Sequence, residues 1–192
     1  MGKTRAPGDD TTAMYNYSQD YPYARIGGAN APGLALLPPL PASSSCPTSY
    51  TAVTAAIDKH RVHRWVTPAM TSTFTSTTRS TLTFWTRTVA GLTGEATICV
   101  SLHKVSSAGA IVGGALATAT HRIASWPVDA NQVSFAFDHA GTPPAAFSLA
   151  SGQRLMLTLS LANTTLPGGI ELLYDHPTYD TVLSVGTTTP IP

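Results

Sequence analysis

The stretch from Arg154 to Leu161 constrains the fold of this chain more than any other. Four leucines alternate there with Arg, Met, Thr and Ser. Successive side chains on a β-strand point to opposite faces of the sheet, so this period of two predicts a strand with one apolar face. A turn rich in Asn, Thr, Pro and Gly follows, and then a second apolar run at 170–174. The pattern predicts a β-meander in which one set of side chains faces a core: Leu155, Leu157, Leu159 and Leu161.

Shorter segments with the same alternation lie upstream. Within residues 80–88, Leu82 and Phe84 fall on one face of a strand, and Trp85 and Arg87 fall on the other. Residues 71–78 are almost all Thr and Ser, which suits a solvent-exposed edge strand. Further strands are expected at 62–66, 96–105, 111–120 and 132–138.

The expected strands are short and regularly separated. They number about eight, turn signals divide them, and no amphipathic helix of any length interrupts them. Such spacing is typical of all-β domains, and long connections between some strands favour a Greek-key or jelly-roll arrangement over an up-and-down barrel. We therefore predict an all-β fold, an antiparallel β-sandwich of jelly-roll or Greek-key type with an extended N-terminal arm.

The first 47 residues differ in composition from the rest. They are rich in Pro, Gly and Tyr, and Pro and Gly disfavour a regular helix or a central strand. We divide the chain into an N-terminal arm (1–47), a β-sandwich domain (48–186) and a Thr/Pro tail (187–192). Two interpretations of the arm stay open: it docks on a neighbouring subunit, or it lies on its own sandwich or is partly disordered. The arm side chains expected to make such contacts are Tyr15, Tyr17, Tyr21, Tyr23, Leu34, Leu36, Leu37 and Leu40.

The chain has two cysteines, Cys46 and Cys99. In the strand expected at 96–105, alternation assigns Ile98 and Val100 to the inner face, so Cys99 should point outward. In an exported protein, a disulfide between the two cysteines would fasten the base of the arm to the outer face of the sheet. The other interpretation is two unrelated free thiols.

Charge and hydropathy exclude several classes of function. Only 11% of the residues are charged and the net charge is +1, whereas nucleic-acid binding requires clustered Lys and Arg. No apolar run approaches the roughly 18 residues of a transmembrane helix, so no membrane span is expected. Low charge with abundant Thr is typical of secreted or assembled surface proteins. We expect an extracellular or cell-surface location, with a leader or anchor absent from this sequence.

Motifs for catalysis and metal binding are weak. No Gly-x-Ser-x-Gly elbow, Ser-x-x-Lys pair, Cys/His site or carboxylate pair stands in a supporting context, so we expect neither enzymatic activity nor a cofactor. The most pointed cluster is Asp175, His176 and Asp180, whose oxygens could contribute to a metal site. The other interpretation of this segment is turn chemistry, in which Asp caps a turn that Pro177 makes rigid.

A ligand platform is a further candidate. Sugar-binding sandwiches stack exposed aromatic rings on the faces of pyranoses. Trp85 should point away from the core beside Arg87, and Trp126 and Tyr179 lie in expected loops. The alternative for Trp85 is burial beneath the arm or in a contact between subunits.

Four segments together carry a family resemblance: residues 82–88, 97–102, 152–157 and 174–180, with the Thr/Pro tail. They resemble a bacterial envelope β-sandwich of exported or membrane-anchored proteins, some of them encoded near pilus and signal-peptidase-like genes. The resemblance covers roughly residues 62–192 and implies a fold without catalytic residues. The chain departs from pilin subunits in lacking an apolar N-terminal helix, and from signal peptidases in lacking their serine–lysine segment.

These observations lead to an expected function. We predict a non-enzymatic structural or assembly component of a bacterial surface structure or filament, which packs on itself or on other protein subunits through its sheet faces and arm. The alternatives are a carbohydrate-binding module that binds glycans through exposed aromatics, and a phage or virion surface protein.

Overall fold

The computed structural model describes residues 15–16, 33–37, 46, 62–88, 92–137, 146–162, 164–166, 169–174 and 182–187. All regular secondary structure among them is β-strand. The strands are β1 (Tyr15–Asn16), β2 (Gly33–Leu37), β3 (Val62–Val66), β4 (Phe74–Thr88), β5 (Ala96–Val105), β6 (Ile111–Ile123), β7 (Asn131–Phe137), β8 (Phe147–Leu149), β9 (Arg154–Ala162), β10 (Ile170–Tyr174) and β11 (Val182–Thr187).

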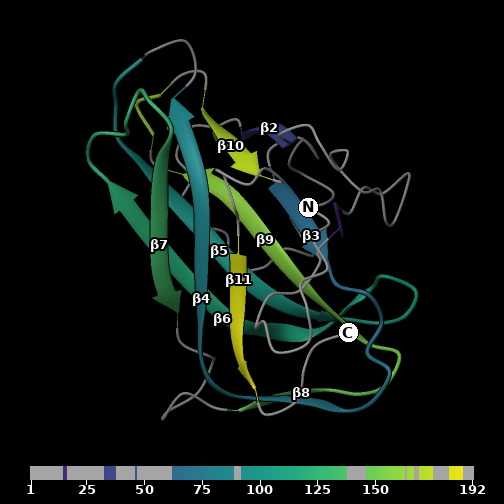
Figure 1. Cartoon of the computed structure of the whole chain (residues 1–192). Coiled ribbons are helices and arrows are strands. Elements are labelled where there is room, and N and C mark those ends of the chain that lie inside the picture. The colour runs from purple at the N-terminus through teal and green to yellow at the C-terminus, as the bar shows by residue number, and fades with distance from the viewer. Residues whose placement is uncertain are drawn as a thin grey trace.

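The strands form two sheets (Figure 1). The five-stranded sheet has the order β1-β3-β9-β5-β6. The six-stranded sheet contains β11, β4, β10 and β2, with β7 and β8 also paired to β4. Every described pairing is antiparallel. The predicted all-β antiparallel fold is therefore confirmed, and the chain crosses repeatedly from one sheet to the other.

Strand β4 is the axis of the six-stranded sheet. Strands β7 and β11 both pair with its middle, where Leu82 lies opposite Phe135 on one side and Leu183 on the other. Strand β10 pairs with the carboxyl end of β4 and β8 with its amino end. Residues 71–78 were expected to form an exposed edge strand, and this prediction is wrong. Ser76 has a strand on each side, and its side chain is fully buried.

The core lies between the two sheets. Alternation along β4 buries the even-numbered side chains that the structure describes, including Leu82 and Phe84, and leaves Trp85 and Arg87 on the outer face, as predicted. From the other sheet, β9 contributes all four predicted leucines. The cluster also contains residues from β3, β5, β8, β10 and β11, among them Trp65, Ile98, Val100, Leu102, Leu149, Leu172 and Val185.

Two N-terminal segments join the edges of the sheets. Strand β1 pairs with β3, and β2 pairs with β10 along its full length, where Leu34 lies opposite Leu173. Residues 33–37 of the predicted arm therefore belong to the chain's own six-stranded sheet. The arm residues Tyr17, Tyr21, Tyr23 and Leu40 lie outside the described part of the chain, as do residues 48–61 and 188–192.

Replacing Leu82 by alanine should test the assignment of the core. Leu82 is fully buried between the sheets, so Leu82→Ala should lower the free energy of unfolding by about 2–5 kcal/mol through lost transfer energy and a residual cavity. Thr81→Ala, on the outer face of the same strand, should cost no more than about 1 kcal/mol. Urea unfolding of both variants measures the difference. Equal losses would contradict the alternation of β4.

Candidate functional site

The outer face of the five-stranded sheet is buried along its two central strands. Side chains that point away from the core on β5 and β9 are at most 4% exposed at five positions that we call the outer stripe: Cys99, Ser101, His103, Thr158 and Ser160. On the next strand, β6, Thr118 and Thr120 pair with stripe residues and are exposed. The covered area therefore ends between β5 and β6.

A disulfide joins Cys46 to this stripe. The two sulfurs of Cys46 and Cys99 lie 2.03 Å apart, and the two Cα atoms lie 5.5 Å apart. Cys99 points outward, as alternation predicted, and the bond that the sequence suggested is present. The disulfide attaches a residue far upstream in the sequence to the centre of the sheet. A disulfide of this kind is consistent with an oxidising compartment.

Three side chains of the stripe form a hydrogen-bonded network. The Ser101 hydroxyl lies 2.7 Å from Nε2 of His103 and 2.5 Å from the Thr158 hydroxyl. Positions 101 and 103 are two apart on β5 and share a face, while Thr158 faces Ser101 across the ladder to β9. The network bonds both hydroxyls and the Nε2 atom of His103, which would otherwise be costly to bury.

The distance between Ser101 and His103 is that of a nucleophile and its general base. The hydroxyl could pass its proton to the imidazole in the manner of an activated serine. However, Ser101 is 1% exposed and His103 is 4% exposed. A substrate cannot reach a hydroxyl buried to this extent, so the pair is not an open catalytic site in this structure.

A small apolar cluster adjoins the His103 end of the stripe. Val66, Val105 and Met156 are at most 2% exposed and pack together, with Ile111 against them. His103 pairs with Met156 across the ladder. The outer face is therefore polar around Cys99 and apolar beyond His103.

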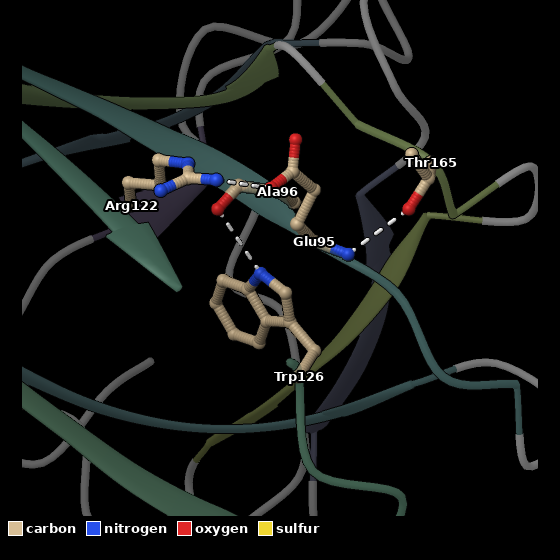
Figure 2. Close-up of polar contacts among 5 residues, drawn as sticks. All are labelled: Glu95, Ala96, Arg122, Trp126 and Thr165. Atoms are coloured by element: carbon tan, nitrogen blue, oxygen red, sulfur yellow. Dashed lines mark hydrogen bonds and ion pairs between the residues drawn. The ribbon is translucent and has the colours of Figure 1, made fainter. Parts of the chain in front are cut away.

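A second polar cluster ties together three connections at one end of the sandwich (Figure 2). The Glu95 backbone N–H donates to the Thr165 hydroxyl at 3.0 Å, and the Thr165 N–H donates to the Glu95 carbonyl at 3.0 Å. The Trp126 N–H donates to the Gly94 carbonyl at 2.8 Å, and the Arg122 guanidinium pairs with the Glu95 carboxylate. We call this set the end clamp.

Trp126 is part of the end clamp and of the core. Its ring is 1% exposed, and its indole N–H donates to the Ala96 carbonyl at 3.2 Å. The prediction that Trp126 belongs to an exposed ligand platform is wrong. The residue does lie in a connection, but the connection folds inward so that the large ring fills the end of the core.

Two other residues of the predicted platform, Trp85 and Arg87, lie on a different surface. Trp85 is half-buried on the outer face of the six-stranded sheet, beside Leu173 on β10, which is 5% exposed. Arg87 forms an ion pair with Glu171, with 2.5 Å between Nε and Oε2. The structure therefore separates Trp85 and Arg87 from the buried Trp126, and Tyr179 lies outside the described residues.

The metal candidates cannot be placed. Asp175, His176 and Asp180 all lie outside the described residues. Within the part of the chain that is described, no group of three or more His, Cys, Asp or Glu side chains is arranged to hold a metal ion. The described residues also contain no helix long and apolar enough to cross a membrane.

The sequence pattern indicates that Ser101 and His103 share one face of a strand. The two residues alternate with Val100 and Leu102 in an expected strand, so their common face could be deduced. What the sequence did not show is that this face is covered. In the sequence, His103 is therefore not distinguished from the other histidines of the chain.

Comparison with solved structures finds several proteins that share this fold. A CocE/NonD family hydrolase from Staphylococcus aureus matches with a TM-score of 0.60 and 10% identity, over 96% of this chain and 38% of that one. An aminopeptidase from a Thaumarchaeota archaeon of marine sediment matches with a TM-score of 0.58 and 12% identity, over 91% of this chain and 36% of that one. An α-amino acid ester hydrolase matches with a TM-score of 0.56 and 12% identity, over 92% and 36%.

These likenesses establish a shared fold over little more than a third of each neighbour. No family model and no curated protein matches the chain. The expectations of a non-enzymatic structural or assembly component, with a carbohydrate-binding module or virion protein as alternatives, are contradicted, because the structural neighbours are hydrolases. The expectation that the chain has no part in enzymatic activity is contradicted on the same ground.

Removing the disulfide should lower the stability of the sandwich. Its cysteines are 53 residues apart, and the loss of a crosslink closing such a loop is expected to cost about 4 kcal/mol through the entropy of the unfolded chain. Urea unfolding with and without reductant measures the cost. The double variant Cys46→Ala/Cys99→Ala should match the reduced protein and should not respond to reductant. An unchanged midpoint on reduction would contradict the expectation.

A methyl group at Gly94 should disrupt the end clamp. A Cβ there would lie 2.7 Å from the Thr165 hydroxyl oxygen and 2.8 Å from Cδ2 of Leu166. We expect Gly94→Ala to cost about 1–3 kcal/mol because the neighbouring connection must shift. Gly114→Ala is the matched control, since a Cβ at Gly114 meets nothing within 4 Å. Thermal unfolding of the two variants compares them, and equal melting temperatures would contradict close packing at Gly94.

Proposed function

We propose that this chain is the β-sandwich unit of a hydrolase that acts on ester bonds or on amino-terminal peptide bonds. The observation that carries the proposal is the pattern of coverage. Each of the hydrolases described above matches more than nine-tenths of this chain with little more than a third of its own length. The substrate class follows the names of two of them, an aminopeptidase and an α-amino acid ester hydrolase.

The burial of Ser101 supports the assignment of catalysis to a unit other than the sandwich. The Ser101 hydroxyl lies within hydrogen-bonding distance of the His103 imidazole, and Ser101 is closed to substrate. The proposed role of the sandwich is therefore to support and position a catalytic unit that carries the reacting groups. Ester and amide hydrolysis depend on such positioning, because small misplacements of the reacting groups are costly in rate.

The end clamp offers a surface for that catalytic unit. Leu92 and Val128 are 43% and 40% exposed, and each lies two residues from a member of the bonded pair Gly94 and Trp126. Backbone hydrogen bonds hold both connections in place, so little conformational entropy is lost on docking. Exposed apolar side chains on a rigid end are suited to a protein contact.

The disulfide and the family resemblance support a location for this hydrolase. Disulfides persist in oxidising compartments, and residues 62–192 resemble sandwiches of the bacterial envelope. We place the hydrolase outside the cytoplasm, either secreted or at the cell surface.

Recovery of hydrolase activity with the chain tests the proposal. The tagged full chain is isolated from its native source, and the eluate is assayed with aminoacyl esters and aminoacyl anilides. We expect hydrolysis by an associated catalytic unit. Leu92→Asp/Val128→Asp should lower the recovered activity about tenfold or more, which corresponds to about 1.4 kcal/mol of lost binding. Val112→Asp is the control, because Val112 is 37% exposed on β6, outside the end clamp.

Each result of this experiment decides one part of the proposal. An eluate that cleaves neither class of substrate would overturn the hydrolase assignment. Equal activity in the Leu92/Val128 and Val112 variants would overturn the docking surface. Activity in the isolated chain alone would overturn the proposal that a separate unit carries the catalytic groups, but it would support the assignment to a hydrolase.

A further inference from the structure

Strand β6 forms one edge of the five-stranded sheet. Among the described strands, β5 is the one that is hydrogen-bonded to it. On the outer face of the sheet, the side chains of Thr118, Thr120 and Arg122 are exposed to solvent. An edge strand presents backbone N–H and C=O groups that can pair with a further strand. The chemistry of this edge therefore suits another β-strand as its partner.

Only the carboxyl-terminal half of β6 is regular. Residues 117–123 pair with 102–96 of β5 without a break, and we call them the regular edge. The register shifts twice between Leu102 and Val105 of β5, opposite the amino-terminal half of β6, where Gly113 has a φ of 77°. Bulges bend an edge strand and hinder its pairing with another chain. The amino-terminal half is protected in this way, and the regular edge is not.

The regular edge also lacks the residues that commonly block edge pairing. It contains no Lys, Pro, Asp or Glu, although Lys and Pro are frequent on the edges of natural sheets. Its one arginine, Arg122, forms an ion pair with Glu95 of the same chain, so its charge is balanced. Neither charge nor proline therefore opposes the approach of a second strand.

The sequence of the regular edge is complementary to itself. Its first half carries small side chains and its second half carries large ones. If two copies pair antiparallel with Thr120 at the two-fold axis, each large side chain faces a small one of the other copy: Ile123 faces Ala117, Arg122 faces Thr118, and His121 faces Ala119. The two arginines are not opposite each other in this register, so like charges are kept apart.

We propose that this chain forms a two-fold symmetric dimer in which the regular edges of two copies pair antiparallel about Thr120. The two five-stranded sheets then continue into one another, with their outer faces on the same side. Main-chain hydrogen bonds supply the attraction, and the small-to-large pairing fixes the register. The contact uses the same segment of both copies, so it closes at two. This inference is independent of the proposed hydrolase.

Sedimentation velocity of the purified full chain, with its disulfide intact, tests the dimer. A contact between two edges is small, so we expect a weak dimer whose share rises with protein concentration. Thr120→Lys should weaken dimerisation about tenfold or more, because two ammonium groups would then face each other at the axis. Val112→Lys is the matched control, since Val112 is 37% exposed on the same strand, outside the regular edge. Its dimerisation should equal that of the natural chain.

A charge exchange tests the register. Thr120→Glu should weaken dimerisation as Thr120→Lys does, because two carboxylates would face each other. An equimolar mixture of the two variants should dimerise again, since an ammonium group then faces a carboxylate across the axis. Thr120 is exposed, so both variants should keep the far-ultraviolet circular dichroism of the natural chain.

Each other outcome overturns the proposal or its register. A natural chain that stays monomeric at every concentration would overturn the dimer, and this test needs no variant. A dimer that Thr120→Lys and Val112→Lys leave equally intact would overturn the assignment to the regular edge. Failure of the mixed variants to dimerise would overturn the two-fold axis at Thr120.

Discussion

Burial of both faces of β5 and β9 is the constraint on which the rest of this structure depends. The inner faces carry Leu, Ile and Val against the six-stranded sheet, and this contact supplies the main core. Around Cys99 the outer faces carry hydroxyl, disulfide and imidazole groups, and the hydroxyl and imidazole groups are costly to bury unless they are hydrogen-bonded. The network at Ser101 provides hydrogen bonds, and the disulfide at Cys99 crosslinks the same face. The central strand pair is thus apolar on one side and cross-linked on the other.

The inner half of this arrangement could be deduced from the sequence. The leucines of β9 and the residues Leu82 and Phe84 of β4 alternate so regularly that their common face is fixed by the geometry of a strand. The same reasoning turned Cys99 outward and made its pairing with Cys46 reasonable. Local pattern suffices for such features because each depends on one strand and its own two faces.

Features that depend on distant partners could not be deduced in this way. Ser76 lies in a run of Thr and Ser that suits an edge, yet strands from 147 and 187 lie on its two sides. Trp126 lies in a connection, yet its ring enters the core and its N–H reaches Ala96. The Ser101–His103 contact was readable as a shared face, but its burial was not. Functional class was the least accessible from the sequence, because the solved structures that share the fold are only 10–12% identical to this chain.

The central position of β4 has a consequence for how the chain reaches its fold. The partners of this strand are supplied late in the sequence, since Ser80 pairs with Phe137 on one side and with Val185 on the other. During synthesis, the backbone groups of the long, Thr-rich β4 therefore stay unpaired until β7 and β11 have been made. Such non-local pairing is entropically slow to form, and unpaired strands are prone to join other chains. The hydroxyl-rich outer face of β4 keeps the unpaired strand hydrated. Its Thr content therefore helps to limit association with other chains during folding, as well as suiting the finished sheet.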